Sequence, residues 1–294
     1  MAVSALAQRA SRCAWYVPLA LCVGAAWLAI TGPAQAAGFA VDASVATHQG
    51  SPSSSITSGT ITTSAPNELV VAFITSDGPT QAGGQTFSSV SGGNLTWKLR
   101  ERSNTQAGTA EIWAAAAPNP FTTVAVTATR SSGAYGGSIK VVALAGADTG
   151  LTGAVGGASA ASGAPSVSLT STRTGSWVWG VGNDWDRALA RTVGGGQTLS
   201  DQYLAPAGDT YWVQSQTASG NTAGSSVTLN DTAPTGDRWD FAAIEILPAI
   251  ADTTPPTAPT NLSKKILAER ERTEGERKLV TALFTDIVGS TSLA

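Results

Sequence analysis

The stretch Glu68-Leu-Val-Val-Ala-Phe-Ile-Thr75 decides the fold class, because it is an uninterrupted run of β-branched, aromatic and other apolar residues. Such runs are typical of buried β-strands, and turn-forming residues bound this one on both sides. Similar runs recur at short spacing, and no sustained helical period occurs before Ser263. The pattern predicts an all-β fold of antiparallel strands, as in sandwiches and jelly rolls. The other runs in the first half are 95–101, 110–114, 122–129 and 138–144.

The same order of strand signals appears a second time along the chain. Ser176–Asp184 matches the run from Glu68, and Trp239–Ile246 matches Ser138–Ala145. An offset of about 100 residues is too long for a solenoid and indicates a duplicated small β domain.

The duplication defines the expected domains. We predict two tandem antiparallel, jelly-roll-like sandwiches at 38–147 and 165–250. A Gly/Ala/Ser-rich connector at 148–164, with little to pack, would join them. One larger sandwich built from both halves is the alternative.

The first 36 residues are typical of a secretory signal peptide. Arg9 and Arg12 precede an apolar run at 14–30, and Ala34-Gln-Ala36 supplies a small-x-small cleavage site. An uncleaved membrane anchor is the alternative, since the apolar run approaches spanning length. In both cases the positive start predicts that the rest of the chain is secreted or extracytoplasmic, and no second apolar span follows.

The composition excludes several classes of function. The net charge of −3 argues against nucleic acid as a partner, because phosphate binding needs a basic surface. Cys13 and Cys22 both lie in the signal segment, so a chain cut there has no disulfide and no thiolate metal site. His48 is the single histidine, which excludes serine triads with a histidine in the second half and zinc sites with several histidines.

Acidic residues follow one strand of the second repeat, in Gly182-Asn-Asp-Trp-Asp-Arg187. Carboxylate oxygens are calcium ligands, so Asp184 and Asp186 are candidates for a calcium site. Aspartates are also ordinary turn residues. A glycan-cleaving enzyme would need two acids facing each other across a cleft, and no such pair is marked out by the sequence.

The tryptophans divide into two groups. Trp185 and Trp239 are flanked by charged residues, so we expect them to form an exposed stacking surface of the kind that sugar-binding modules present. The others that carry strand signals are expected in the core, and they are Trp113, Trp177, Trp179 and Trp212.

The region at 38–250 resembles uncharacterised modules of large secreted bacterial proteins. The residues that carry the resemblance are Asn183–Arg187, Gly208–Val213 and Arg238–Ile246. The resemblance implies a sandwich outside the cell and carries no established activity. We therefore predict a non-catalytic module that binds glycan or another cell-envelope polymer.

The composition changes abruptly after Ile250. The Pro/Thr-rich segment 251–262 is similar to the linker that opens a fibronectin type III module in secreted bacterial enzymes. The module does not follow. Ten of the sixteen residues at 263–278 are charged instead, which predicts an exposed helix.

The last residues resemble the opening of a class III adenylate/guanylate cyclase domain, with a strand at 279–284 and the turn Thr285-Asp-Ile-Val-Gly-Ser-Thr291. The resemblance implies that Asp286 and the Ile287 carbonyl would bind Mg²⁺ or Mn²⁺, and that a dimer partner is needed. It also implies that three residues lie near the phosphates of the nucleotide, and these are Gly289, Ser290 and Thr291.

The resemblance covers residues 263–294, which are about 30 of the 294 residues of the chain. The second metal carboxylate, the base-selecting residues and the transition-state residues of the family would lie beyond Ala294, so this chain alone is not expected to cyclise a nucleotide. One interpretation is the extracytoplasmic sensor part of a truncated cyclase. The other is a broken or chimeric bacterial reading frame, because a cyclase exported with the sandwiches would have no ATP.

Overall fold

The computed structural model describes residues 39–250 and Arg272. Residues 39–250 form sixteen β-strands, and every strand pairing is antiparallel. The predicted all-β antiparallel class is therefore confirmed. The predicted signal peptide, the linker at 251–262 and the cyclase-like segment with its helix and strand lie outside the described residues, apart from Arg272.

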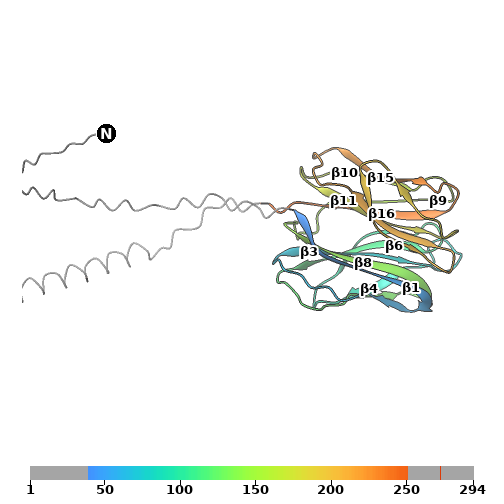
Figure 1. The fold of residues 1–294 in the computed structure, drawn as a ribbon, viewed down its shortest axis with the longest axis horizontal. Helices are drawn as coiled ribbons and strands as arrows, with labels where there is room; N and C mark the ends of the chain where they lie inside the picture. Colours follow the sequence, from blue (N-terminus) through green and yellow to red (C-terminus); the bar gives the residue numbers. More distant parts are fainter. Residues whose placement is uncertain (1–38, 251–271, 273–294) are drawn as a thin grey trace, which may run out of the picture.

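The strands form four sheets (Figure 1). Inner sheet 1 has the order β1 (Ala40–Ser53), β8 (Tyr135–Ala145), β3 (Glu68–Ser76), β6 (Thr109–Ala117) and β5 (Lys98–Ser103). Outer sheet 1 has the order β2 (Ser55–Thr57), β7 (Thr127–Arg130) and β4 (Phe87–Ser91). Inner sheet 2 has the order β9 (Val155–Ala160), β16 (Trp239–Ile246), β11 (Trp177–Asp184), β14 (Thr210–Gln216) and β13 (Gln197–Leu204). Outer sheet 2 has the order β10 (Ser166–Thr170), β15 (Ser226–Ala233) and β12 (Thr192–Val193).

The second eight strands repeat the order of the first eight. Adding eight to each strand number of inner sheet 1 gives the order of inner sheet 2, and the same holds for the outer sheets. The duplication seen in the sequence thus has a counterpart in the strand order.

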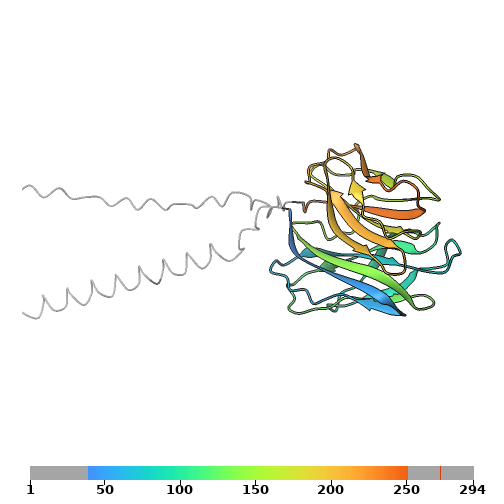
Figure 2. The ribbon, with the colours of Figure 1, turned by 45° about the vertical axis from the view of Figure 1, so that its right-hand side comes forward.

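The sheets stack as four layers with three hydrophobic cores between them (Figures 1 and 2). Strand β3 shows why, because side chains point alternately to its two faces. Val70, Ala72 and Ile74 pack toward outer sheet 1, whereas Leu69, Val71 and Phe73 pack toward inner sheet 2. An unbroken apolar run is therefore needed, since both faces of this strand are buried.

The middle core is shared by the two halves of the chain. Phe73 of β3 stacks on Trp179 of β11, with 5.8 Å between the ring centroids. Two tandem sandwiches were predicted, with one larger sandwich as the alternative, and the inner sheets of the two halves face each other along this core. Trp113, Trp179 and Trp212 are 9%, 4% and 1% exposed, so their predicted burial is confirmed, whereas Trp177 is half-buried.

The predicted connector at 148–164 contains a strand. β9 pairs with β16 at the edge of inner sheet 2, and Ser103 Oγ donates to the Ala158 carbonyl at 2.7 Å. A Cβ added at Gly156 would lie 2.6 Å from the Ser168 carbonyl oxygen. The small residues, which suggested a loose connector, are needed because backbone packs closely here.

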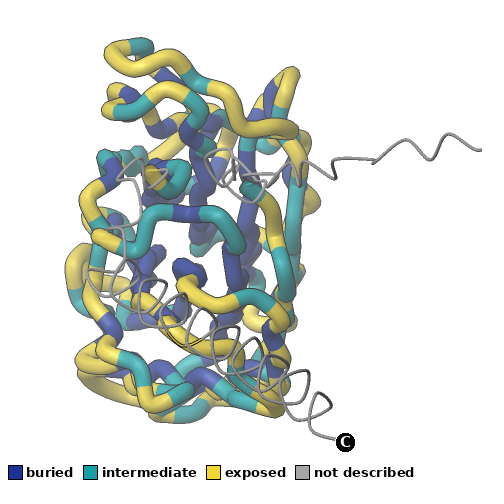
Figure 3. Tube along the Cα trace, turned by 90° about the vertical axis from the view of Figure 1, so that its left-hand side faces the viewer, coloured by how far each residue is buried: buried dark blue, intermediate teal, exposed yellow. Residues whose placement is uncertain are grey.

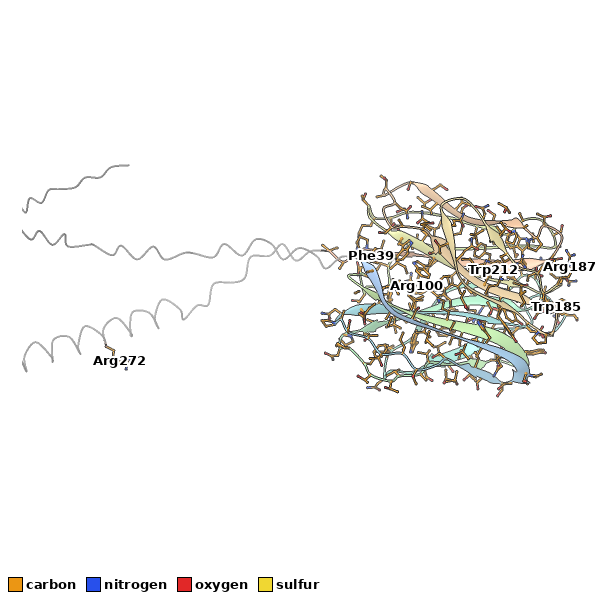
Figure 4. All side chains as sticks on the ribbon, in the orientation of Figure 1. Phe39, Arg100, Trp185, Arg187, Trp212 and Arg272 are labelled. Atoms are coloured by element: carbon orange, nitrogen blue, oxygen red, sulfur yellow. The ribbon has the colours of Figure 1, made fainter. Side chains whose placement is uncertain are left out.

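Both ends of the described segment lie at one end of the molecule. Phe39 packs edge-on against Trp177, which is paired with Ile246 of β16. Ala249 N donates to the Gly146 carbonyl at 2.8 Å. We call this end the terminal end; Figure 3 looks onto it and shows buried segments inside a rim of exposed loops. The opposite end, where Figure 4 places Trp185 and Arg187, is the distal end.

Candidate functional site

The residues that the sequence selected come together at the distal end. Asp184 is the last residue of β11 and pairs with Trp239, the first residue of β16. Trp185 and Asp186 follow directly in the loop after β11. These residues lie together at one end of inner sheet 2, and their side-chain partners decide what they do.

Asp184 is a core residue. It is fully buried and forms an ion pair with Arg191, which is 6% exposed. The Arg191 guanidinium lies over the Trp212 ring, 4.5 Å from its centroid. Burial raises the pKa of Asp184 to about 6, although the attraction of Arg191 opposes the rise. An aspartate enclosed with its own arginine has no open coordination sphere for calcium.

Asp186 is also paired with arginine. Arg238 Nε lies 2.8 Å from Asp186 Oδ1, and the Arg238 backbone amide donates to Asp186 Oδ2 at 2.8 Å. Within residues 39–250 no group of three or more acidic, histidine or cysteine side chains is placed to hold a metal ion. The structure gives the calcium prediction at Asp184 and Asp186 no support.

The two tryptophans have different surroundings. Trp239 is 6% exposed and its Nε1 donates to the Gly163 carbonyl at 3.0 Å, so its predicted exposure is wrong. Its neighbours in the chain are charged, but its ring belongs to the core between inner and outer sheet 2. Trp185 is half-buried, with Arg238 stacked 4.9 Å from the ring centroid and Nε1 donating to Asp77 Oδ1 at 2.8 Å. These partners occupy one ring face and the polar atom that a sugar would use.

A hollow at the terminal end was not foreseen from the sequence. It has a volume of about 420 Å³ and opens between the turn before β5, the end of β6 and the loop after β8. We call it the terminal groove. Its lining residues are Asn94, Leu95, Thr96, Lys98, Ala116, Pro118, Thr149, Gly150 and Leu151.

The terminal groove combines polar and apolar side chains. Lys98 is its only charged lining residue, is exposed, and forms no ion pair within residues 39–250. Asn94 and Thr149 offer amide and hydroxyl groups, whereas Leu151 and Pro118 offer apolar surface. Small-molecule and sugar sites have this mixture.

Thr149 also borders a second hollow of about 280 Å³ that reaches Asn67 and Ile250. Asp148 lies there and is paired with Arg173 Nη1 at 2.6 Å. Burial alone would raise the pKa of Asp148, but the hydrogen bonds from Arg173 and Gly150 outweigh it and the pKa is lowered. The second hollow therefore adds no free charge.

Left-handed backbone conformations occur around both hollows. Asn67, Asn94 and Leu151 have φ of 56°, 53° and 57°, in the left-handed region that disfavours L-residues. Only Thr123 shares this property among the non-glycine residues at 39–250. Left-handed residues cluster at ligand sites more often than elsewhere, because the surrounding structure must hold them.

Comparisons of the chain with protein-family models, curated proteins and solved structures gave no match. The site must therefore be judged from its chemistry.

The remaining predicted residues lie outside the described part of the chain. They are Asp286, Ile287, Gly289, Ser290 and Thr291. Within the described part no helix is long and apolar enough to cross a membrane.

Proposed function

We propose that residues 38–250 are a secreted, non-catalytic β-sandwich module that binds a glycan or cell-envelope polymer in the terminal groove. The observation that carries the proposal is the groove itself, where amide, hydroxyl and apolar groups surround one ammonium group that forms no ion pair within residues 39–250. Hydroxyl-rich ligands use amide and hydroxyl partners, and the C–H faces of sugar rings pack on apolar side chains. Each half would be a sandwich of one inner and one outer sheet.

A binding role fits the distal aspartates better than catalysis does. A glycosidase needs one carboxylic acid and one free carboxylate facing each other across a cleft. Asp184, Asp186 and Asp237 each form an ion pair with an arginine instead. Their arrangement supports a structural role, in which ion pairs connect the loop after β11 to the start of β16.

The groove ligand is expected to be anionic, because Lys98 is the single charged group there. The full-length chain would be tested on an array of neutral glycans and of uronate- or phosphate-bearing envelope polymers. Lys98→Gln should weaken binding of an anionic polymer about two- to fivefold, as expected for an exposed ion pair. Arg187→Gln makes the same change of charge at the distal end and should leave binding unchanged.

A variant that fills the groove gives the sharper test. Thr149→Trp should reduce binding more than about tenfold, since Thr149 borders both hollows and the indole would displace the ligand. Thr192→Trp, an equal change on the exposed strand β12, is the matched control. Binding that survives Thr149→Trp but is lost in Trp185→Ala would move the site to the distal end. No binding to any polymer would reject the function.

A second candidate is the extracytoplasmic sensor part of a class III cyclase. Phe39 and Ile250 both lie at the terminal end, and this position favours the sensor. A sensor that is joined to further segments at both residues would point its distal end away from them. Sequencing the locus across codons 250–294 and beyond tests it. An open frame with a second metal-binding aspartate would support a cyclase, and a stop or an assembly break would reject it.

A further inference from the structure

Glu68, the first residue of β3, is buried without a basic partner among residues 39–250. The side chain is fully buried, and neither carboxylate oxygen lies at hydrogen-bond distance from a donor in this part of the chain. A buried carboxylate is normally paired or hydrogen-bonded, because transfer of the charge from water is costly. The charged form of Glu68 therefore needs a proton or a cation that residues 39–250 do not supply.

A second carboxylate lies beside it. Asp42 and the Thr63 hydroxyl are the side chains that act on Glu68, and Asp42 raises the pKa of Glu68 through like-charge repulsion in addition to the larger effect of burial. No lysine or arginine of residues 39–250 forms an ion pair with either acid. Two adjacent carboxylates without a basic neighbour take up either a proton or a cation.

The local backbone brings the oxygen atoms together. Asp42 sits at a β-bulge of β1, where the register shifts between Val41 and Ala43. Bulges redirect side chains and are frequent next to functional sites. Ser64 donates to Asp42 through its backbone amide at 2.6 Å and through its hydroxyl at 2.5 Å.

Thr63 completes the group. Its Oγ1 accepts a hydrogen bond from the Phe121 amide at 3.1 Å, which fixes the side chain beside Glu68. The cluster thus offers two carboxylates and two hydroxyl groups. Asp42 is half-buried and Ser64 is exposed, so the cluster is open to solvent on one side.

We propose that Asp42, Thr63, Ser64 and Glu68 form a calcium-binding site. Calcium takes six to eight oxygen ligands in flexible geometry, and mixed carboxylate and hydroxyl oxygens with water suit it. The hard oxygen donors and the absence of sulfur and imidazole disfavour softer transition metals. Binding would fix the loop before β3 to the bulge of β1, so the bound ion should stabilise the fold.

Thermal unfolding of the full-length chain at about pH 7.5, with CaCl₂ or with EDTA, tests the proposal. At a calcium concentration about a hundredfold above Kd, the Tm should rise by about 5 to 10 °C. Glu68→Gln and Asp42→Asn should each abolish the rise, and isothermal titration with CaCl₂ should show one site in the parent chain and none in either variant. Asp186→Asn, which changes the aspartate that the sequence favoured, should keep the full rise.

Three results would overturn the proposal. The first is that the parent chain binds no calcium and has a Tm that depends on pH but not on calcium. Glu68 and Asp42 would then share a proton. The second is a calcium response that survives Glu68→Gln. The third is an equal response to MgCl₂ in the parent and both variants, which would indicate non-specific binding of cations.

Discussion

Asp209 should make the folded protein less stable as the pH rises. Its side chain is 3% exposed and accepts a hydrogen bond from the Tyr211 hydroxyl at 2.5 Å. Burial is the largest cause that raises its pKa, and the nearby carboxylates Asp77, Asp184 and Asp186 add to it. The pKa rises from 3.8 to about 7.

The magnitude follows from linkage. Because the pKa is raised in the folded state, the folded protein binds more protons than the unfolded chain between about pH 4 and pH 7. Stability is therefore highest below this window and is lost as the pH rises through it. At about 1.4 kcal/mol per pKa unit, the loss for this group alone is about 4 kcal/mol in full, and about 2.6 kcal/mol of it falls between about pH 5 and pH 8.

Asp209→Asn removes the titrating group and keeps an acceptor for Tyr211. Urea unfolding followed by tryptophan fluorescence would give the free energy of unfolding at about pH 5 and pH 8. The parent chain should lose about 2 to 3 kcal/mol more than the variant between these two values. Buried Asp231 and Asp240 also have raised pKa values, so the difference between the two proteins isolates Asp209.

A matched control comes from the aspartate in the second hollow. The pKa of Asp148 is lowered, so it is ionised at both pH values and Asp148→Asn should change stability equally at each. If Asp209→Asn shows the same loss between about pH 5 and pH 8 as the parent, Asp209 does not titrate as described and the argument is refuted.

Three further perturbations test the packing. Glu245→Gln should lower the free energy of unfolding by about 2 to 4 kcal/mol, measured in urea. Hydrogen bonds from Thr172, Ala154 and Ser171 to the Glu245 carboxylate outweigh the effect of burial and lower its pKa to about 2. A loss below about 1 kcal/mol would contradict this. Trp239→Ala should cost about 3 to 5 kcal/mol in the same assay and half-buried Trp185→Ala clearly less, whereas equal losses would contradict the burial described. A fragment of residues 38–147 should be insoluble, or should lack a cooperative thermal transition by circular dichroism, because it exposes Leu69, Val71 and Phe73. A cooperative transition would show that the first half folds alone.

The central strands of the inner sheets were predictable because both of their faces are buried. Each needs an apolar run, and Glu68–Ser76 and Trp239–Ile246 are close to the predicted bounds. The strands at the sheet edges carry a weaker signal. β13 is polar and half-exposed along most of its length, and β9 is made of small residues, so neither was predicted.

The candidate sites were less predictable than the strands, because they depend on contacts between distant parts of the chain. The loop at Asp184 and Asp186 drew attention as a local cluster of acids, but the arginines that neutralise it come from residues 191 and 238. Glu68 and Asp42 are 26 positions apart in the sequence, and a bulge brings Asp42 into place. No local sequence pattern predicts a bulge, so the pairing of Glu68 with Asp42 could be found only in the folded structure.

The shared core also bears on where function can lie. Leu69, Val71 and Phe73 face the other half, so the inner sheets cannot present a binding face to solvent. In a free sandwich the inner face of each sheet packs on its partner and the outer face is open. Here the outer faces of the inner sheets are covered, which leaves the outer sheets and the two ends. The ends carry the hollows, the left-handed residues and the buried acids with raised pKa, because loops there are not tied to the alternation of a strand. The packing of the two halves therefore buries the sheet faces and leaves chemistry to the loops, and the terminal end has both the open groove and the buried carboxylate of Glu68.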